Sequence, residues 1–188
     1  MVQSGDFFSV YPHFYNLNLS NNYSLQEEYL AKPAFLLDVH LGKLARFLRR
    51  FNFDTAYRND YSDKEIVDIA EAETRIILTR DLGLLMRKRV KWGTFIKYDD
   101  PKEQLKQVFL RYNLISYYRG EGSRCVDCNT ELIEVDKSEI MQRLEPKTKK
   151  YYDKFKICPN CGKLYWKGSH YHEAEDLLEK FIDSKNKF

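Results

Sequence analysis

The sequence predicts an α/β fold with a mainly parallel sheet, joined to a small module that contains four cysteines. Three observations predict this fold class. Short apolar runs alternate with helical patterns over 34–112, which is typical of parallel strands joined by crossover helices. All four cysteines occur in two C-x-x-C pairs beyond this region. Hydrophobic residues make up 43% of the 188 residues, which is enough for a buried core.

The first predicted strand and helix lie within residues 34–50. The run 34–39 is apolar and has the length of a buried strand. Apolar side chains then recur at helical spacing from Leu41 to Leu48, which predicts an amphipathic helix. Its opposite face carries four basic side chains: Lys43, Arg46, Arg49 and Arg50.

The remaining elements continue the alternation of strands and helices. Further strands are expected at 53–57, 75–79 and 94–98. Ser62 and Glu65 form a capping box, which predicts a helix to about residue 73. A helix is expected over 82–89, and Pro101 marks the start of a last helix that runs to about Tyr112.

Changes in composition divide the chain into four predicted parts. Residues 1–33 form an N-terminal extension, in which Ser24 and Glu27 predict the start of a short helix. The α/β domain occupies 34–119. The cysteine module occupies 120–172, begins at a hinge-like Gly-Glu-Gly-Ser run and contains a short helix at 138–144. Residues 173–188 form a C-terminal amphipathic helix.

Three aspartates lie where predicted strands end or helices begin. Asp38 ends the first strand, Asp81 follows the third, and Asp63 opens the helix between the second and third strands. The carboxyl ends of parallel strands meet at one edge of a sheet, so these carboxylates can face a common site. Carboxylates held close together repel each other unless a cation lies among them, and Mg²⁺ or Mn²⁺ suits such ligands. An ion held there can activate water for phosphodiester hydrolysis.

Two of these aspartates also have a purely structural explanation. Asp63 at a helix N-terminus is favourable to the helix dipole, and Asp81 can cap the helix that follows it. Asp38 has no obvious structural role, because it places a charge at the end of an apolar strand. Together the three aspartates predict a hydrolytic metal site, with helix capping as the alternative for Asp63 and Asp81.

The four cysteines predict a structural zinc site. Cys125 and Cys128 form the first pair, and Cys158 and Cys161 form the second. Two thiolates per turn suit tetrahedral zinc, and four cysteines leave no open position for chemistry. Residues 129–157 separate the pairs, which is longer than the roughly 15–20 residues of compact zinc sites. Redox-active C-x-x-C pairs are the alternative.

Basic side chains indicate where nucleic acid would bind. The net charge of +3 allows an RNA partner but does not require one. The segment 143–156 is locally basic, with six Lys and Arg against two acids. No signal peptide or membrane span is recognisable, so we expect a cytoplasmic protein without a membrane partner. Contacts with RNA are expected from six side chains: Lys43, Arg46, Arg80, Lys149, Lys150 and His170.

Several motifs, in order, resemble the PIN-like ribonuclease family named for the C-terminal domain of the Mut-seven exonuclease. The resemblance covers about 34–172 and is carried by FLLD (35–38), LGKLARFLR (41–49), FDT (53–55), SDKEI (62–66), ILTRD (77–81) and YWKGSHY (165–171). It implies a three-layer α/β/α PIN-like fold, a metal-dependent RNase site at Asp38, Asp63 and Asp81, and a fused zinc ribbon. Members usually have four acidic residues at the site, and only three have a match here.

Two classes of function therefore compete at the level of sequence. The leading hypothesis is a Mg²⁺- or Mn²⁺-dependent ribonuclease with one structural zinc ion in a ribbon that helps to bind RNA. The alternative is a non-catalytic factor that binds RNA, rRNA or the ribosome and retains a vestigial acidic site. A toxin-like nuclease with a protein partner is a third hypothesis.

Overall fold

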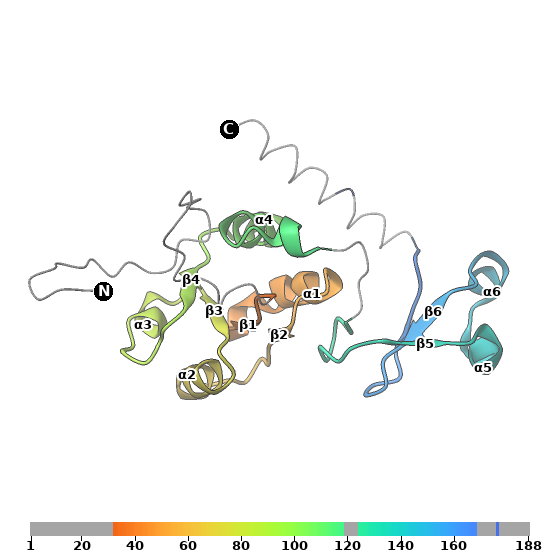
Figure 1. Cartoon of the computed structure of the whole chain (residues 1–188), viewed down its shortest axis with the longest axis horizontal. Helices are drawn as coiled ribbons and strands as arrows, with labels where there is room; N and C mark the ends of the chain where they lie inside the picture. Colours follow the sequence, from red (N-terminus) through yellow and green to blue (C-terminus); the bar gives the residue numbers. More distant parts are fainter. Residues whose placement is uncertain (1–31, 119–123, 169–175, 177–188) are drawn as a thin grey trace, which may run out of the picture.

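The computed structural model describes residues 32–118, 124–168 and 176. This part of the chain forms a parallel sheet between helices and, beside it, a smaller antiparallel sheet (Figure 1). Several predicted features lie outside the described residues. These are most of the extension 1–33 with its capping box, the hinge at 120–123, His170 and the helix expected within 173–188.

The main sheet has four parallel strands in the order β2-β1-β3-β4. The two central strands are continuous buried runs, as expected for a sheet covered on both faces. In the register of the sheet, Leu37 lies opposite Leu78 and Thr79 lies opposite Phe95. The predicted parallel sheet is therefore confirmed. Its strands are β1 (Phe35–Leu37), β2 (Thr55–Ala56), β3 (Ile76–Thr79) and β4 (Gly93–Phe95).

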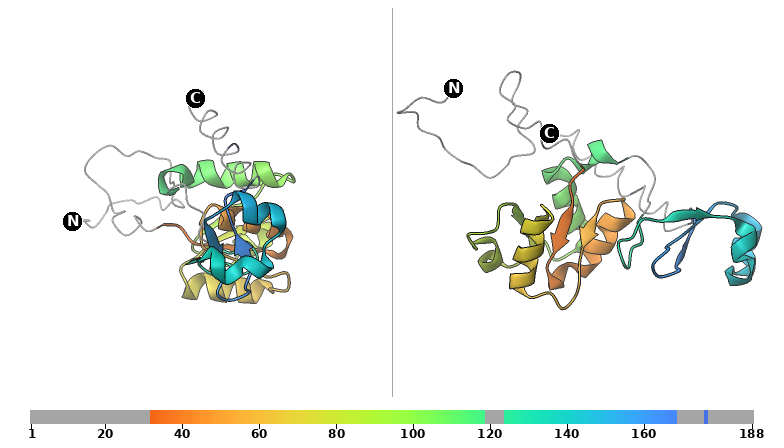
Figure 2. Two further views of the ribbon diagram at one scale, coloured as in Figure 1. Left: turned by 90° about the vertical axis from the view of Figure 1, so that its right-hand side faces the viewer. Right: turned by 60° about the horizontal axis from the view of Figure 1, so that its bottom comes forward.

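Helices cover both faces of this sheet and make three layers (Figures 1 and 2). Helices α1 (Gly42–Arg50) and α4 (Pro101–Arg111) pack on one face, and α2 (Asp63–Ala72) and α3 (Leu82–Leu85) pack on the other. The predicted capping box of α2 is present, because Ser62 and Glu65 exchange hydrogen bonds. Two short 3₁₀ turns, η2 (Val39–Leu41) and η3 (Leu114–Tyr117), complete the domain.

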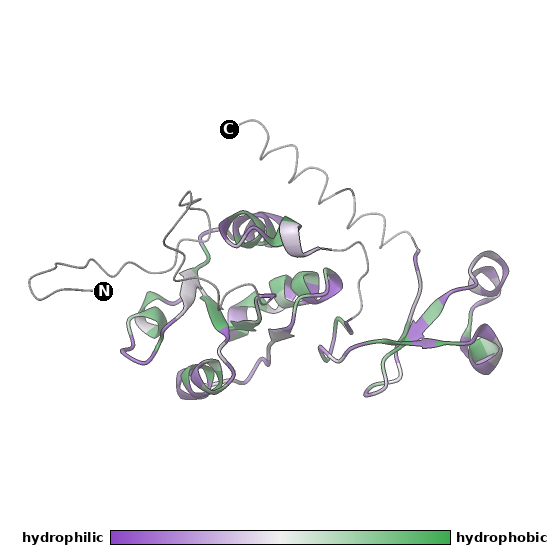
Figure 3. Cartoon of the chain, viewed as in Figure 1, coloured by the Kyte–Doolittle hydropathy of each residue, from purple (hydrophilic) through white to green (hydrophobic). Residues whose placement is uncertain are grey.

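Alternation along β1 and β3 builds a separate core on each face of the sheet. Phe35, Leu37 and Leu78 belong to the core under α1 and α4, whereas Leu36 and Ile77 belong to the core under α2 and α3. Figure 3 shows the hydrophobic colour on the central strands and on parts of the helices around them. The tightly packed sheet gives the residues at its carboxyl edge fixed positions.

Several elements differ from their predicted extent. The strands are shorter than expected, and α3 ends at Leu85, whereas a helix was expected over 82–89. Arg49, on the basic face of α1, is buried, with only 3% of the residue exposed. The cause lies far away in the chain: backbone carbonyl groups of the cysteine module accept hydrogen bonds from this guanidinium group.

The cysteine module is a three-stranded antiparallel ribbon with the order β5-β6-β7. Its own hydrophobic core is small and centres on Ile140, Leu144 and Phe155. The helix predicted at 138–144 is present as α5 followed by a 3₁₀ turn. The elements of the ribbon are β5 (Ile133–Val135), α5 (Lys137–Ile140), η4 (Met141–Arg143), α6 (Pro146–Tyr151), β6 (Phe155–Ile157) and β7 (Leu164–Tyr165).

No helix of the described residues is long and apolar enough to cross a lipid bilayer.

Candidate functional site

Asp38 is a buried carboxylate at the carboxyl end of β1, with 5% of the residue exposed. Its Oδ1 atom accepts a hydrogen bond of 2.9 Å from the amide of His40 and thereby caps η2. Its Oδ2 atom accepts hydrogen bonds from the Thr79 hydroxyl group and from the amide of Arg80, the latter at 2.9 Å. The local structure therefore gives Asp38 the capping role that its sequence position did not suggest.

Thr79 links Asp38 to Asp81 across the sheet. The Thr79 hydroxyl group donates to Asp38 and accepts a hydrogen bond of 2.8 Å from the amide of Asp81. The Asp81 side chain caps α3 by accepting a hydrogen bond of 2.7 Å from the amide of Gly83. Because β1 and β3 are adjacent parallel strands, this network joins the two aspartates at one edge of the sheet.

Asp63 lies apart from this network in the structure. It is the first residue of α2, and its carboxylate pairs with the Arg87 guanidinium group at 2.6 Å. Both side chains are nearly half exposed. Among the described residues, the three aspartates do not form a group whose ligand atoms lie within 4.8 Å of one another. The structure thus joins Asp38 and Asp81 and leaves Asp63 paired with a basic residue.

The basic residues expected to contact RNA lie in different places. Arg80 follows Thr79 at the edge of the sheet that carries Asp38 and Asp81, which we call the acidic edge. The Arg80 side chain pairs with the exposed carboxylate of Asp99. Arg46 pairs with Asp127 between the two cysteines of the first pair, whereas Lys43 is exposed on α1. Two others belong to α6 of the ribbon, which lies away from the main sheet: Lys149 and Lys150 (Figure 1).

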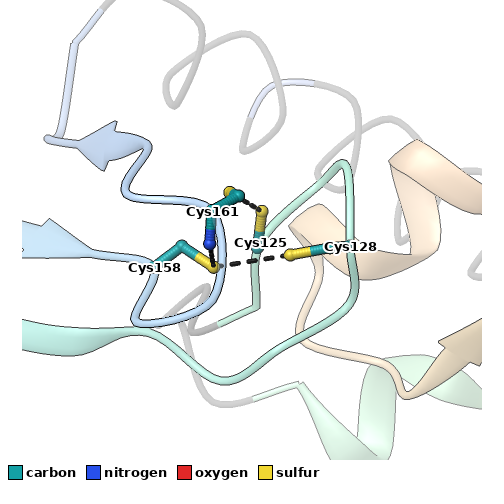
Figure 4. A group of neighbouring side chains, drawn as sticks. All are labelled: Cys125, Cys128, Cys158 and Cys161. Carbon is teal, nitrogen blue, oxygen red and sulfur yellow. Dashed lines mark hydrogen bonds between the residues drawn. The ribbon is translucent and has the colours of Figure 1, made fainter.

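The four cysteines converge from two loops of the ribbon (Figure 4). Their sulfur atoms all lie within 4.8 Å of one another, with 3.6 Å between Cys125 and Cys161 and 3.4 Å between Cys128 and Cys158. All four are free thiols. Tetrahedral zinc with bonds of about 2.3 Å requires sulfur atoms roughly 3.8 Å apart, so this cluster can hold such an ion.

The pKa values of two of these thiols also bear on metal binding. Burial acts to raise the pKa of Cys128, but hydrogen bonds with Thr130 and Asn160 outweigh it and lower that pKa to about 6. A backbone hydrogen bond from Lys163 acts to lower the pKa of Cys161, yet contacts with the other three cysteines raise it to about 12. The Cys161 thiol therefore resists ionisation beside its sulfur neighbours, and a bound dication would relieve that repulsion.

Neighbouring groups already orient the sulfur atoms. The Tyr165 hydroxyl group donates to Cys125 Sγ at 3.1 Å and accepts a hydrogen bond of 3.1 Å from the amide of Val126. The amide of Cys161 donates to Cys158 Sγ at 3.5 Å. Hydrogen bonds of this kind fix the orientation of metal ligands, and they support a structural role for the cluster.

Thr79 is the residue of the acidic edge that sequence reasoning did not identify. The available signal was a polar residue at the end of an apolar run, directly before Arg80 and Asp81. Its function depends on contacts with Asp38, which lies 41 residues earlier in the chain. A local pattern cannot predict a partner at that separation.

The family resemblance in the sequence predicts RNA cleavage, and replacing Thr79 by Val should lower it about tenfold to a hundredfold, the usual effect of losing a group that orients a ligand. Val keeps the volume but removes both hydrogen bonds that join Asp38 to Asp81. The measurement is single-turnover cleavage of labelled RNA. Thr94→Val is the matched control, because Thr94 is also buried and its hydroxyl group bonds Tyr112 away from this edge. Equal activity of the two variants would show that Thr79 does not contribute to the site.

One comparison with known proteins gives a result. The family model described as "Mut7-C RNAse domain" matches residues 33–178, which is well over half of the chain. The matched range includes both the parallel sheet and the cysteine ribbon. No curated protein and no solved structure matches the chain.

Proposed function

Because the chain belongs to the Mut7-C RNAse domain family, we propose that it is a ribonuclease that uses Mg²⁺ or Mn²⁺ at the carboxyl edge of its parallel sheet. An RNase domain has RNA as its substrate, and phosphodiester hydrolysis is the reaction. Asp38 and Asp81 are the proposed catalytic carboxylates, and Asp63 is the proposed third. The four cysteines are the proposed ligands of one structural zinc ion.

The observation that carries this proposal is the buried, hydrogen-bonded carboxylate of Asp38. It accepts three hydrogen bonds, two of them from backbone amides. No ion pair joins it to a basic side chain anywhere in the part of the chain that the structure describes. A buried negative charge is costly without a cation, so the position suits a metal ligand.

The chemistry of the donors fits a hard divalent cation. Mg²⁺ binds through one or two carboxylates and keeps several waters, so Asp38 and Asp81 would be sufficient protein ligands. A bound ion of this kind supplies an activated water and a positive charge near the phosphoryl oxygens. The protein's part is to hold the two carboxylates in place, which the hydrogen bonds of Thr79 and Gly83 achieve.

Asp63 requires a rearrangement before it can take part. Its ion pair with Arg87 is exposed on both sides, and exposed pairs contribute little to stability. An RNA phosphate near α2 could attract Arg87 and leave the Asp63 carboxylate free. Arg80, whose partner Asp99 is also exposed, is the proposed phosphate contact closest in sequence to the acidic edge.

The ribbon is the proposed second RNA-binding surface. Lys149 and Lys150 lie in the last turn of α6, where basic side chains also favour the helix dipole. Their charge attracts a phosphate backbone without selecting its sequence. Lys43 on α1 remains a proposed contact, whereas Arg46 would first have to leave Asp127.

The proposal predicts cleavage that depends on added Mg²⁺ or Mn²⁺ while the structural zinc ion stays bound. The protein is freed of loosely bound ions by gel filtration without a chelator, and its zinc content is measured. Labelled single-stranded and structured RNA are then incubated with no added ion, with Mg²⁺ and with Mn²⁺. We expect cleavage only in the last two reactions. RNA that is bound but intact under all three conditions would favour the non-catalytic RNA-binding factor.

A further inference from the structure

The first cysteine pair of the ribbon lies against the edge of the main sheet. Strand β2 is an edge strand, since the order of the sheet is β2-β1-β3-β4. The amide of Thr55 in this strand donates a hydrogen bond of 3.0 Å to Asn129 Oδ1, directly after Cys128. The Thr55 carbonyl group accepts a hydrogen bond of 2.9 Å from Arg49 Nε. Groups that an edge strand would otherwise leave unpaired are thus satisfied.

Arg49 connects the two modules through its guanidinium group. While Nε donates to Thr55, Nη1 donates to the carbonyl oxygens of Val126 at 3.1 Å and of Asp127 at 2.7 Å. These two residues stand between Cys125 and Cys128, so their carbonyl groups point at Arg49 only while the turn of the first pair keeps its shape. The buried guanidinium group would lose these partners if the turn rearranged.

Asn129 completes the contact from the side of the ribbon. Asn129 has a backbone φ of 68°, and its backbone amide donates to the carbonyl of Cys125 at 2.9 Å. The turn therefore fixes the direction in which the Asn129 side chain leaves the backbone. Its side-chain Nδ2 donates to Asp54 at 2.8 Å. Asp54 also pairs with Arg75 at 2.7 Å, which connects Asn129 to the start of β3.

We propose that metal binding at the four cysteines docks the ribbon on the nuclease sheet, with Arg49 and Asn129 as the residues that couple the metal site to strand β2. The bound ion fixes the turn between Cys125 and Cys128, and the turn presents three oxygen atoms to Arg49 and Thr55. Loss of the ion frees the turn, so the edge of β2 opens while the central strands stay folded. This inference concerns the link between the modules and does not depend on catalysis.

The first readout is hydrogen exchange at the Thr55 amide in the full chain. Removing the metal with a chelator should speed its exchange about tenfold or more, because its acceptor Asn129 is no longer held. The amide of Leu36 in the central strand β1 should keep its protection. Unchanged exchange at Thr55 after complete metal removal would overturn the proposal.

The second readout is zinc affinity, measured by competition with a chromogenic chelator. Coupling between two sites is reciprocal, so weakening the docking contact must weaken metal binding as well. Arg49→Lys leaves every cysteine in place but removes the forked contact with Val126 and Asp127. We expect its zinc affinity to fall about fivefold or more, the lower end of usual coupling between sites.

A matched control comes from the same helix. Arg46→Lys alters a contact with the same turn, but its ion pair with Asp127 is exposed on both sides. Its zinc affinity should therefore stay close to that of the unchanged chain. Asn129→Gly tolerates the positive φ and removes the side chain, so it should resemble Arg49→Lys. Equal zinc affinities for Arg49→Lys and Arg46→Lys would contradict the coupling, whether or not the protein cleaves RNA.

Discussion

Replacing Asp38 by Asn is expected to lower RNA cleavage about a hundredfold or more, which is the scale of losing a group that stabilises charge at a reaction centre. Asn removes the negative charge that would bind the cation but keeps an oxygen that can cap η2. Its amide group replaces the Oδ2 atom that accepts from Thr79 and Arg80, so thermal unfolding of the variant is measured beside its activity. Single-turnover cleavage in saturating Mg²⁺ measures the effect, and titration with Mn²⁺ followed by calorimetry measures the loss of ion binding.

Asp100→Asn is the control for the structural role of Asp38. Asp100 caps α4 by accepting hydrogen bonds from Lys102 and Glu103, so it performs the same capping function in another place. This variant should cleave RNA at the rate of the unchanged protein. A variant Asp38→Asn that retains full cleavage and full Mn²⁺ binding would remove Asp38 from the proposed metal site.

Replacing Cys158 by Ser should release the proposed zinc ion and unfold the ribbon over residues 124–168. Among the described residues, the hydrophobic core of the ribbon is small and lies around Ile140, Leu144 and Phe155, so the proposed zinc ion is expected to supply most of its stability. Structural zinc contributes on the order of 10 kcal/mol in small domains, which far exceeds what such a core supplies. Zinc per chain and limited proteolysis measure the two consequences.

The rest of the protein provides the comparison for this variant. The core of the main sheet consists of residues from β1 to η3, so this domain should remain folded and resist the protease. Tyr151→Ser is the control within the ribbon, because Tyr151 is 67% exposed and should contribute little. A variant Cys158→Ser that holds one zinc per chain and resists proteolysis would show that this cysteine is not a required ligand.

Local sequence patterns were sufficient for most of the fold. Apolar runs and helical spacing predicted the four parallel strands and their helices in the right order, because hydrophobic periodicity reflects burial directly. Boundaries were less accurate: α3 ends at Leu85 instead of continuing to residue 89. The pairing of two C-x-x-C motifs also predicted a cluster that the structure confirms, since two ligands on one tight turn are nearly fixed by their spacing.

The candidate acidic site was predictable only in part. The position of Asp38 and Asp81 at strand ends followed from the alternation of strands and helices. The role of Thr79 between them did not, and neither did the ion pair of Asp63 with Arg87, 24 residues further on. These partners come from separate parts of the chain, and only the packing of β1 against β3, and of α2 against the segment after α3, brings them together.

The sequence alone determined the fold class, the likeness to a ribonuclease family and the four cysteines of the ribbon. Each rests on residues that are close in the chain, where spacing dictates geometry. Only the tertiary structure decided which side chains are joined: Asp38 with Thr79, and Arg49 with the turn at Val126 and Asp127. The physical reason is that a hydrogen bond requires its two atoms to be about 3 Å apart, and for residues distant in the chain that closeness exists only after folding.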